Sequence, residues 1–92
     1  MADRNGSKPA DVVREAAQQL AQFTGRAPEK VLGLDKDDDG WRITFEVLEL
    51  SRVPNSSDVL GSYVVTVDRN GDLVGYERRH RYLRAQVDGG GE

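Results

Sequence analysis

One stretch of the sequence has the residue spacing of a calcium-binding loop. The matching residues are Asp35, Asp37, Asp39, Gly40 and Glu46. Such a loop lies between two helices, whereas the residues on both sides of this one alternate as β-strands do. In an extended strand Glu46 would lie about 20 Å from the turn, at ~3.3 Å per residue, too far to complete a coordination sphere. We therefore expect a solvated acidic hairpin tip and no metal site, with a calcium-responsive module as the alternative.

A second stretch, from Tyr76 to Arg84, holds four arginines, two tyrosines and one glutamate. It fits a ladder of cross-strand ion pairs, for which the available carboxylates are those of Glu46, Glu49 and Glu77. It also fits a protein-binding face, because Arg and Tyr are common interface anchors. A nucleic-acid surface is the third interpretation, since arginine and tyrosine contact phosphates and stack on bases. The chain as a whole argues against the third, because its net charge of −3 opposes binding to a polyanion.

Residues typical of catalytic and metal sites are few. The chain has no cysteine and one histidine, His80, which stands among arginines. Glu46 and Glu49 have the chemistry of a general acid and base, but no nucleophile or metal ligand accompanies them at a suitable spacing. We therefore expect a protein that is not an enzyme and that binds no cofactor.

Length and hydropathy bound the class of protein. A chain of 92 residues forms one domain, which we place at residues 8–87, between a disordered segment at 1–7 and a flexible glycine-rich tail at 88–92. No apolar run approaches the roughly 18 residues of a membrane span. The N-terminal residues lack the apolar stretch of a signal peptide. These features predict a cytoplasmic protein that does not contact membranes.

Apolar residues at helical spacing predict a helix from Pro9 to Thr24. Its apolar stripe consists of Val12, Ala16, Leu20 and Phe23, widened by Val13 and Ala17. Pro9 suits the first turn, and Gly25 suits a left-handed C-cap. We expect this helix to pack on the core.

A hairpin is predicted for residues 31–37 and 41–47, with Asp39 and Gly40 as its two-residue turn. This turn places Leu34 opposite Phe45 and Leu32 opposite Val47. After Val47 the apolar residues change from odd to even positions, which a β-bulge or a strand covered on both faces would explain.

A second hairpin is predicted for residues 59–68 and 73–84 around Asn70 and Gly71. The expected pairs are Val67 with Val74, Val65 with Tyr76, Tyr63 with Arg78, Gly61 with His80 and Val59 with Tyr82. Regular alternation places Arg78 and Arg81 on opposite faces unless a bulge intervenes.

The order of elements predicts an α+β fold, in which one N-terminal helix packs on a four-stranded antiparallel β-meander. A single helix covers one face of such a sheet. The other face is then either solvated or in contact with a partner.

Several of these segments together resemble the gas vesicle protein GvpO family. The residues that carry the resemblance are Trp41, the run from Glu46 to Pro54, Asp58 to Leu60, Tyr63, Gly71, Tyr76 to Arg78 and Arg81 to Arg84. The similarity covers about residues 10–85, and the acidic tip and both termini lie outside it.

The resemblance implies a non-enzymatic accessory protein of gas vesicle formation, located in a prokaryotic cytoplasm or associated with gas vesicles. Its implied partners are other gas vesicle proteins, namely the apolar shell protein and further accessory proteins. The residues implied in partner binding are Glu46, Glu49, Arg52, Pro54, Tyr63, Tyr76, Arg78, Arg81 and Tyr82. The alternative is a regulator of gas vesicle expression that contacts nucleic acid through Arg78, Arg79, Arg81 and Arg84. The resemblance specifies neither the direct partner nor the oligomeric state.

Overall fold

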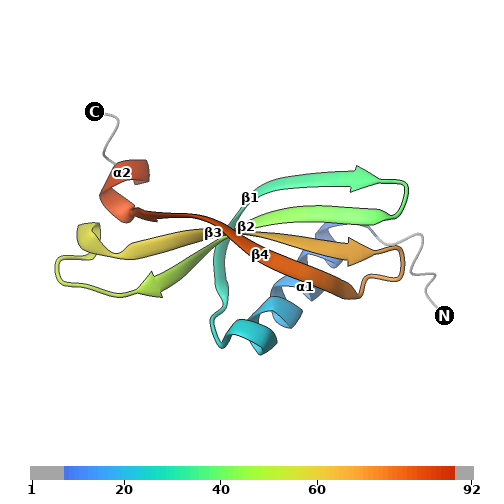
Figure 1. The fold of residues 1–92 in the computed structure, drawn as a ribbon, viewed down its shortest axis with the longest axis horizontal. Coiled ribbons are helices and arrows are strands. Elements are labelled where there is room, and N and C mark those ends of the chain that lie inside the picture. Colours follow the sequence, from blue (N-terminus) through green and yellow to red (C-terminus); the bar gives the residue numbers. More distant parts are fainter. Residues whose placement is uncertain (1–7, 89–92) are drawn as a thin grey trace.

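The computed structural model describes residues 8–88, so the predicted disordered segment at 1–7 and the last four residues of the predicted tail lie outside the described part. The described elements are α1 (Pro9–Thr24), β1 (Pro28–Asp37), β2 (Gly40–Leu50), η2 (Asn55–Ser57), β3 (Val59–Asp68), β4 (Leu73–Leu83) and α2 (Arg84–Asp88). The strands form one sheet in the order β1-β2-β3-β4 with antiparallel neighbours (Figure 1). This confirms the predicted α+β meander.

Helix α1 has the predicted bounds and the predicted cap. Gly25 has a φ of 78° and donates its backbone N–H to the carbonyl of Ala21 at 2.7 Å, which ends the helix. Phe23 does not join the buried stripe as predicted, because its side chain is 63% exposed. At its last turn α1 reaches the edge strand β4, where the Phe23 ring contacts Tyr76 at a centroid distance of 6.0 Å.

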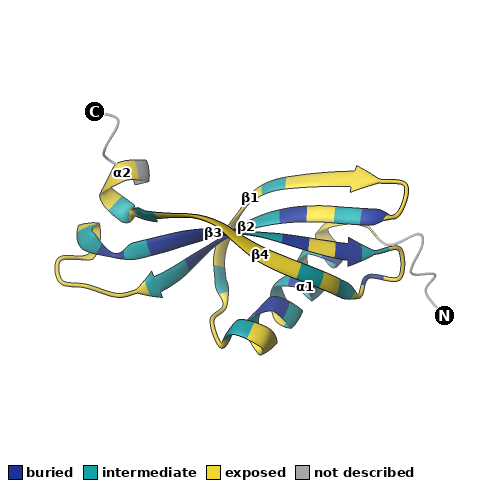
Figure 2. Ribbon diagram, viewed as in Figure 1, coloured by how far each residue is buried: buried dark blue, intermediate teal, exposed yellow. Residues whose placement is uncertain are grey.

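The core lies between α1 and the sheet face beneath it, here called the helix-side face; the opposite face is called the open face. The buried core residues are Val12, Ala16, Leu20, Ile43, Phe45, Val47, Val65 and Val67. The β2 members are odd-numbered, as a half-buried strand requires (Figure 2). Gln19 also ties α1 to the β3–β4 turn, since its amide donates to the Gly71 carbonyl at 3.0 Å and accepts from the Leu73 N–H at 2.8 Å.

The turn between β1 and β2 consists of Asp38 and Asp39, one residue earlier than predicted. Asp37 Oδ1 accepts the backbone N–H groups of Asp39 and Gly40, both at 2.9 Å, and these bonds fix the turn. Gly40 therefore lies in β2, opposite Asp37.

The two pairs predicted for this hairpin are consequently wrong. Leu34 lies opposite Ile43 rather than Phe45. Leu32 does not lie opposite Val47, because a register shift between its two neighbours leaves it outside the ladder.

The change of apolar pattern in β2 corresponds to a bulge. Leu48 lies opposite Leu60 and Leu50 lies opposite Val59, so Glu49 is an extra residue. This confirms the first of the two explanations drawn from the sequence.

The second hairpin has the predicted third strand and two extra residues in β4. The confirmed pairs are Val65 with Tyr76 and Tyr63 with Arg78. The other three are wrong because Val74 and Arg79 lie outside the ladder. The observed pairs are Val67 with Leu73, Gly61 with Arg81 and Val59 with Leu83. β4 also ends one residue earlier than predicted, where the unpredicted helix α2 begins.

Candidate functional site

A buried carboxylate, that of Glu49, holds a network on the helix-side face. Its side chain is 5% exposed. Oε2 accepts the Tyr63 hydroxyl at 2.9 Å, while Oε1 contacts Arg78 Nη1 at 3.0 Å and Arg81 Nε at 3.1 Å. Gly61 leaves room for this carboxylate, because a Cβ there would overlap Glu49 Oε2. We call these four charged and phenolic side chains the Glu49 network.

Two bulges bring the Glu49 network together. The bulge in β2 makes Glu49 the extra residue, and the bulge in β4 makes Arg79 the extra residue between Tyr63–Arg78 and Ser62–His80. Because of the second bulge, Arg78 and Arg81 lie on the same face. The sequence predicts that these two arginines lie on opposite faces unless a bulge intervenes, and the structure has such a bulge.

A second buried carboxylate lies on the open face. Glu46 is 3% exposed and follows Phe45, which faces the core, so its side chain points the other way. Its Oε2 accepts the Tyr82 hydroxyl at 2.9 Å, and its Oε1 lies 3.9 Å from Lys30 Nζ. Burial and the bond to this carboxylate raise the pKa of Tyr82 to about 12. Burial and the bond to Glu49 likewise raise the pKa of Tyr63.

Alkaline titration should reveal the Glu46–Tyr82 bond. We expect Tyr82 to ionise with a pKa of about 12 rather than the ordinary 10.0, so its contribution to stability is complete below pH 10 and is lost as the pH rises to about 12. The near-ultraviolet absorbance of tyrosinate measures this, with Tyr82→Phe identifying the signal. Glu46→Gln should lower the pKa of Tyr82 toward 10, and an unchanged titration in that variant would contradict the assignment.

The loop that precedes β3 is held by a third buried carboxylate, Asp58. Its Oδ1 accepts the backbone N–H of Arg52 at 2.7 Å, and its Oδ2 accepts Arg84 Nε at 3.1 Å. Arg84 also contacts Glu29 of β1 at 3.1 Å. Asp58 and Glu29 were not among the candidate site residues. A lone aspartate between a loop and a strand was the available signal, and it is a weak one.

The nine residues implied in partner binding therefore fall in three places. The helix-side face carries Glu49, Tyr63, Tyr76, Arg78 and Arg81. The open face carries Glu46 and Tyr82, and the loop after β2 carries Arg52 and Pro54, both exposed.

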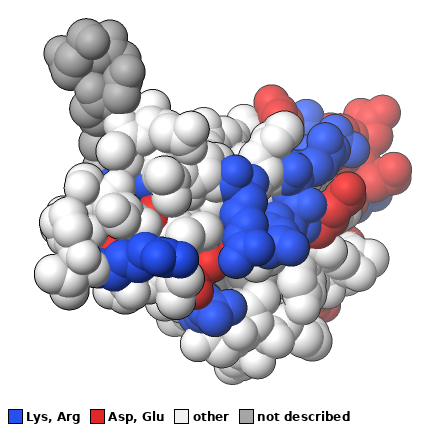
Figure 3. All heavy atoms as spheres, turned by 60° about the vertical axis from the view of Figure 1, so that its left-hand side comes forward, with Lys and Arg blue, Asp and Glu red and all other residues white. Residues whose placement is uncertain are grey.

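Beyond the end of α1, exposed arginines and apolar side chains lie on or next to the helix-side face, and we call this set the basic surface. It consists of Arg26, Arg78, Arg81, Phe23, Tyr76, Leu50 and Leu83. The rings of Phe23, Tyr76 and Tyr63 follow one another at centroid distances of 6.0 and 6.3 Å. Leu50 and Leu83 both flank Val59 in the next row of the sheet. Figure 3 shows basic side chains gathered across the middle of the molecule, whereas the acidic ones lie mainly at the end away from α2.

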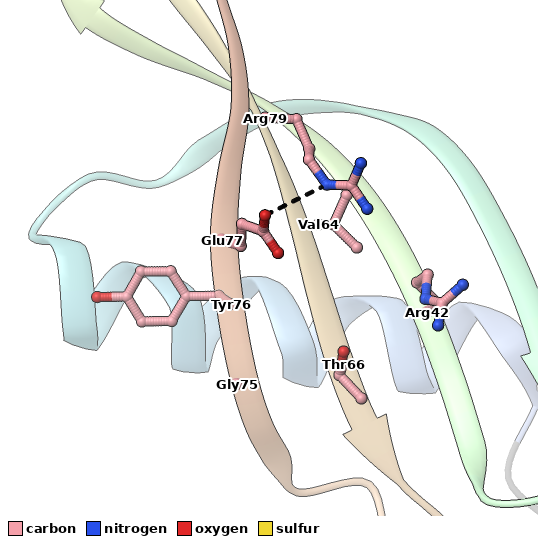
Figure 4. Close-up of a pocket in the computed structure, with 7 residues that line it drawn as sticks. All are labelled: Arg42, Val64, Thr66, Gly75, Tyr76, Glu77 and Arg79. Carbon is pink, nitrogen blue, oxygen red and sulfur yellow. Dashed lines mark ion pairs between the residues drawn. The ribbon is translucent and has the colours of Figure 1, made fainter.

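The open face carries a shallow groove of about 340 Å³. The lining residues are Arg42, Val64, Thr66, Gly75, Tyr76, Glu77 and Arg79 (Figure 4). Glu77 lies 3.7 Å from Arg79 Nε, and the Tyr76 ring points away from the groove. Arg42 and Arg79 could hold an anionic group here, but Glu77 offsets part of their charge.

Comparison with known proteins places the chain in a family. A family model described as gas vesicle synthesis protein GvpO matches residues 2–88. The chain belongs to the GvpO family. The match includes every candidate site residue named above.

Curated GvpO relatives agree with this assignment. Gas vesicle protein O of Streptomyces sp. (strain CB03234) is 45% identical over 80 residues, which cover 87% of this chain and 62% of the relative. Gas vesicle protein O1 of Halobacterium salinarum is 41% identical over 76 residues, covering 80% and 60%, and gas vesicle protein O of Haloferax mediterranei is 35% identical over 74 residues, covering 80% and 51%. The chain thus spans less than two thirds of the length of these GvpO relatives. No solved structure matches it significantly.

The residues of the calcium-loop spacing have other tasks in this GvpO chain. Asp37 closes the hairpin turn, and Glu46 binds Tyr82 on the open face. Within residues 8–88 no group of three or more acidic, histidine or cysteine residues is placed to hold a metal ion. No helix of this described part is long and apolar enough to cross a membrane.

Proposed function

We propose that the chain is a non-enzymatic accessory protein of gas vesicle assembly, acting in the cytoplasm or on gas vesicles through contacts with the shell protein or another accessory protein. Its place in the GvpO family supports the assembly role. The relatives are longer, so the proposal concerns the part of the protein that this chain represents.

The basic surface is the proposed interface, and the observation that carries this choice is the sharing of one carboxylate. Glu49 is buried and contacts two guanidinium groups, whose side chains remain 46% and 58% exposed. The Arg26 guanidinium is also exposed, and its charge lies near enough to Tyr63 of the same network to oppose part of the rise in the pKa of Tyr63. Two guanidinium groups thus share one carboxylate and a third lies nearby, which gives this part of the described chain an excess of positive charge.

Apolar side chains complete this interface. Phe23, Tyr76, Leu50 and Leu83 are all partly or largely exposed around the arginines. Aromatic and arginine side chains are the residues that most often dominate the binding energy of interfaces. A partner segment that combines apolar side chains with carboxylates would match this surface.

Co-purification tests the proposal. The chain carrying both Phe23→Ser and Arg26→Glu should lose its gas vesicle partner, since each side chain is exposed and lies on the basic surface. Arg42→Glu is the matched control, because it makes the same charge change on the open face. We expect wild-type and Arg42→Glu chains to retain the same partner. Retention by the double variant, or loss only with Arg42→Glu, would contradict the proposed interface.

The nucleic-acid alternative gains no support from the arrangement of its four arginines. Arg78 and Arg81 share Glu49, Arg84 binds Asp58, and Arg79 lies beside Glu77. They do not form a single row facing a phosphate backbone. Binding that falls steeply with salt would favour this alternative over a protein partner.

A further inference from the structure

The free edge of β1 is unusual for an edge strand. β1 lies at one end of the sheet, with β2 as its only neighbouring strand in the described chain (Figure 1). It nevertheless exposes three aliphatic side chains, those of Val31, Leu32 and Leu34, by 44, 47 and 37%. Figure 2 shows most of the strand as exposed. An edge strand with exposed apolar residues is a template for another strand.

We propose that β1 binds β1 of a second copy of this chain, antiparallel, about a twofold axis at Gly33. The occupant is identified by the sequence pattern of the strand itself. Read in the reverse direction, the order of apolar, acidic and basic residues along β1 complements the order in the forward direction.

Two bulges set the spacing along β1. Its pairing with β2 shifts between Pro28 and Lys30 and again between Val31 and Gly33, which makes Glu29 and Leu32 extra residues. Each bulge then counts as one step of the ladder.

Counted in this way, residues that can pair favourably lie at equal distances on the two sides of Gly33. Leu34 is one step away on one side, and the Val31–Leu32 bulge is one step away on the other. At two steps Asp35 matches Lys30. An antiparallel pair about Gly33 therefore places apolar residues together and joins Asp35 of each copy to Lys30 of the other. Cross-strand pairs of both kinds stabilise a sheet.

The faces agree as well. Val31 and Leu34 lie opposite Phe45 and Ile43, so both face the helix side. Lys30 and Asp35 lie opposite Glu46 and Arg42, so both face the open side. A twofold axis perpendicular to the sheet requires this agreement, because it keeps each face on its own side.

The glycine on the proposed axis has no evident role within one chain. A Cβ at Gly33 would meet only Thr44, at 3.9 Å, and the residue has no positive φ. A glycine inside a strand often marks the close approach of another backbone. The second β1 strand would supply that backbone.

The other edge of the sheet lacks this complementarity. β4 carries Arg78 and Arg79 before His80 and Arg81 after it. Self-pairing there would place like charges opposite one another, which is destabilising. Charge thus selects β1, and the resulting eight-stranded sheet leaves the basic surface at β4 accessible.

A single cysteine tests the register, because the chain has none. In Gly33→Cys the two cysteines would face each other across the axis. Their Cα atoms would be about 4.5–5.5 Å apart, which suits a disulfide. We expect mild oxidation to give a disulfide-linked dimer at least about ten times faster than in Val74→Cys, the control on the β4 edge. Val74 is also exposed and lies outside its ladder. Equal rates would overturn the proposal.

Sedimentation equilibrium provides the second measurement. The wild-type chain should have twice its monomer mass of 10.2 kDa, whereas Leu34→Lys and Asp35→Lys should be monomers with unchanged circular dichroism. Val74→Lys should remain dimeric. A monomeric wild type, or a dimer that both β1 variants retain, would overturn the proposal.

Discussion

Replacing Glu49 by glutamine is expected to lower the free energy of unfolding by about 2–3 kcal/mol. The carboxylate is 5% exposed and neutralises two guanidinium groups while accepting a phenol. Glutamine has nearly the same shape but no charge, so Arg78 and Arg81 would repel each other beside a neutral amide. Urea unfolding followed by the fluorescence of Trp41 measures the loss.

Glu77→Gln is the matched control for this effect. Its side chain is 69% exposed and lies 3.7 Å from Arg79, so it should change the free energy of unfolding by less than about 0.5 kcal/mol. A similar loss in both variants would show that the Glu49 network contributes no more than an ordinary surface ion pair.

Replacing Gly40 by alanine should have a still larger effect, a loss of at least about 3 kcal/mol or failure to fold. Gly40 has a backbone φ of 152°, which residues with a side chain rarely adopt. A Cβ there would overlap the Val67 carbonyl oxygen and lie 2.8 Å from backbone atoms of Asp68. Because the clash is with backbone, no rotamer change relieves it, and β2 and β3 would have to separate.

Gly75→Ala provides the comparison for Gly40. A Cβ at Gly75 meets no atom within 4 Å, and its φ is not positive. This variant should be neutral or slightly more stable, by up to about 0.5 kcal/mol. Thermal unfolding of the two variants decides the matter. If Gly40→Ala melted within a few degrees of Gly75→Ala, the close approach of β3 would be refuted.

The elements of the fold follow from periodicity, because a half-buried sheet and a one-sided helix impose it directly on the sequence. Val12, Ala16 and Leu20 repeat at helical spacing, and Ile43, Phe45 and Val47 alternate at period two. These patterns were sufficient for the bounds of α1 and β3 and for the order of the sheet. Phe23 follows the same pattern but lies exposed, since periodicity does not state where the sheet beneath a helix ends.

The strand registers depend on contacts that no local pattern records. The first turn is set by the Asp37 carboxylate, whose bonds outweigh the ordinary preference for glycine in a two-residue turn. The bulge at Glu49 is visible in the sequence as a change of apolar parity, for which a bulge is one of two explanations. The bulge at Arg79 causes no such change, because polar residues surround it on both sides.

The candidate site was predictable as a set of residues but not as an arrangement. Arginines and glutamates were recognisable as potential partners. Which arginine meets which carboxylate depends on the face of β4 on which each arginine lies. The bulge at Arg79 sets that face, because it places Arg78 and Arg81 on the same side. Asp58 contributes to the family resemblance but was not among the candidate site residues, since only the folded chain brings Arg84 to it.

The extra residue Arg79 has a consequence for both sides of the sheet at once. Without it, Arg81 would turn to the open face and Tyr82 to the helix-side face, so each would leave its present carboxylate. One register thus controls two chemically separate contacts that lie back to back. The ionisation of Tyr82 on the open face therefore reports on the position of Arg81 on the helix-side face. A partner that shifts β4 by one residue would change the ultraviolet titration of Tyr82.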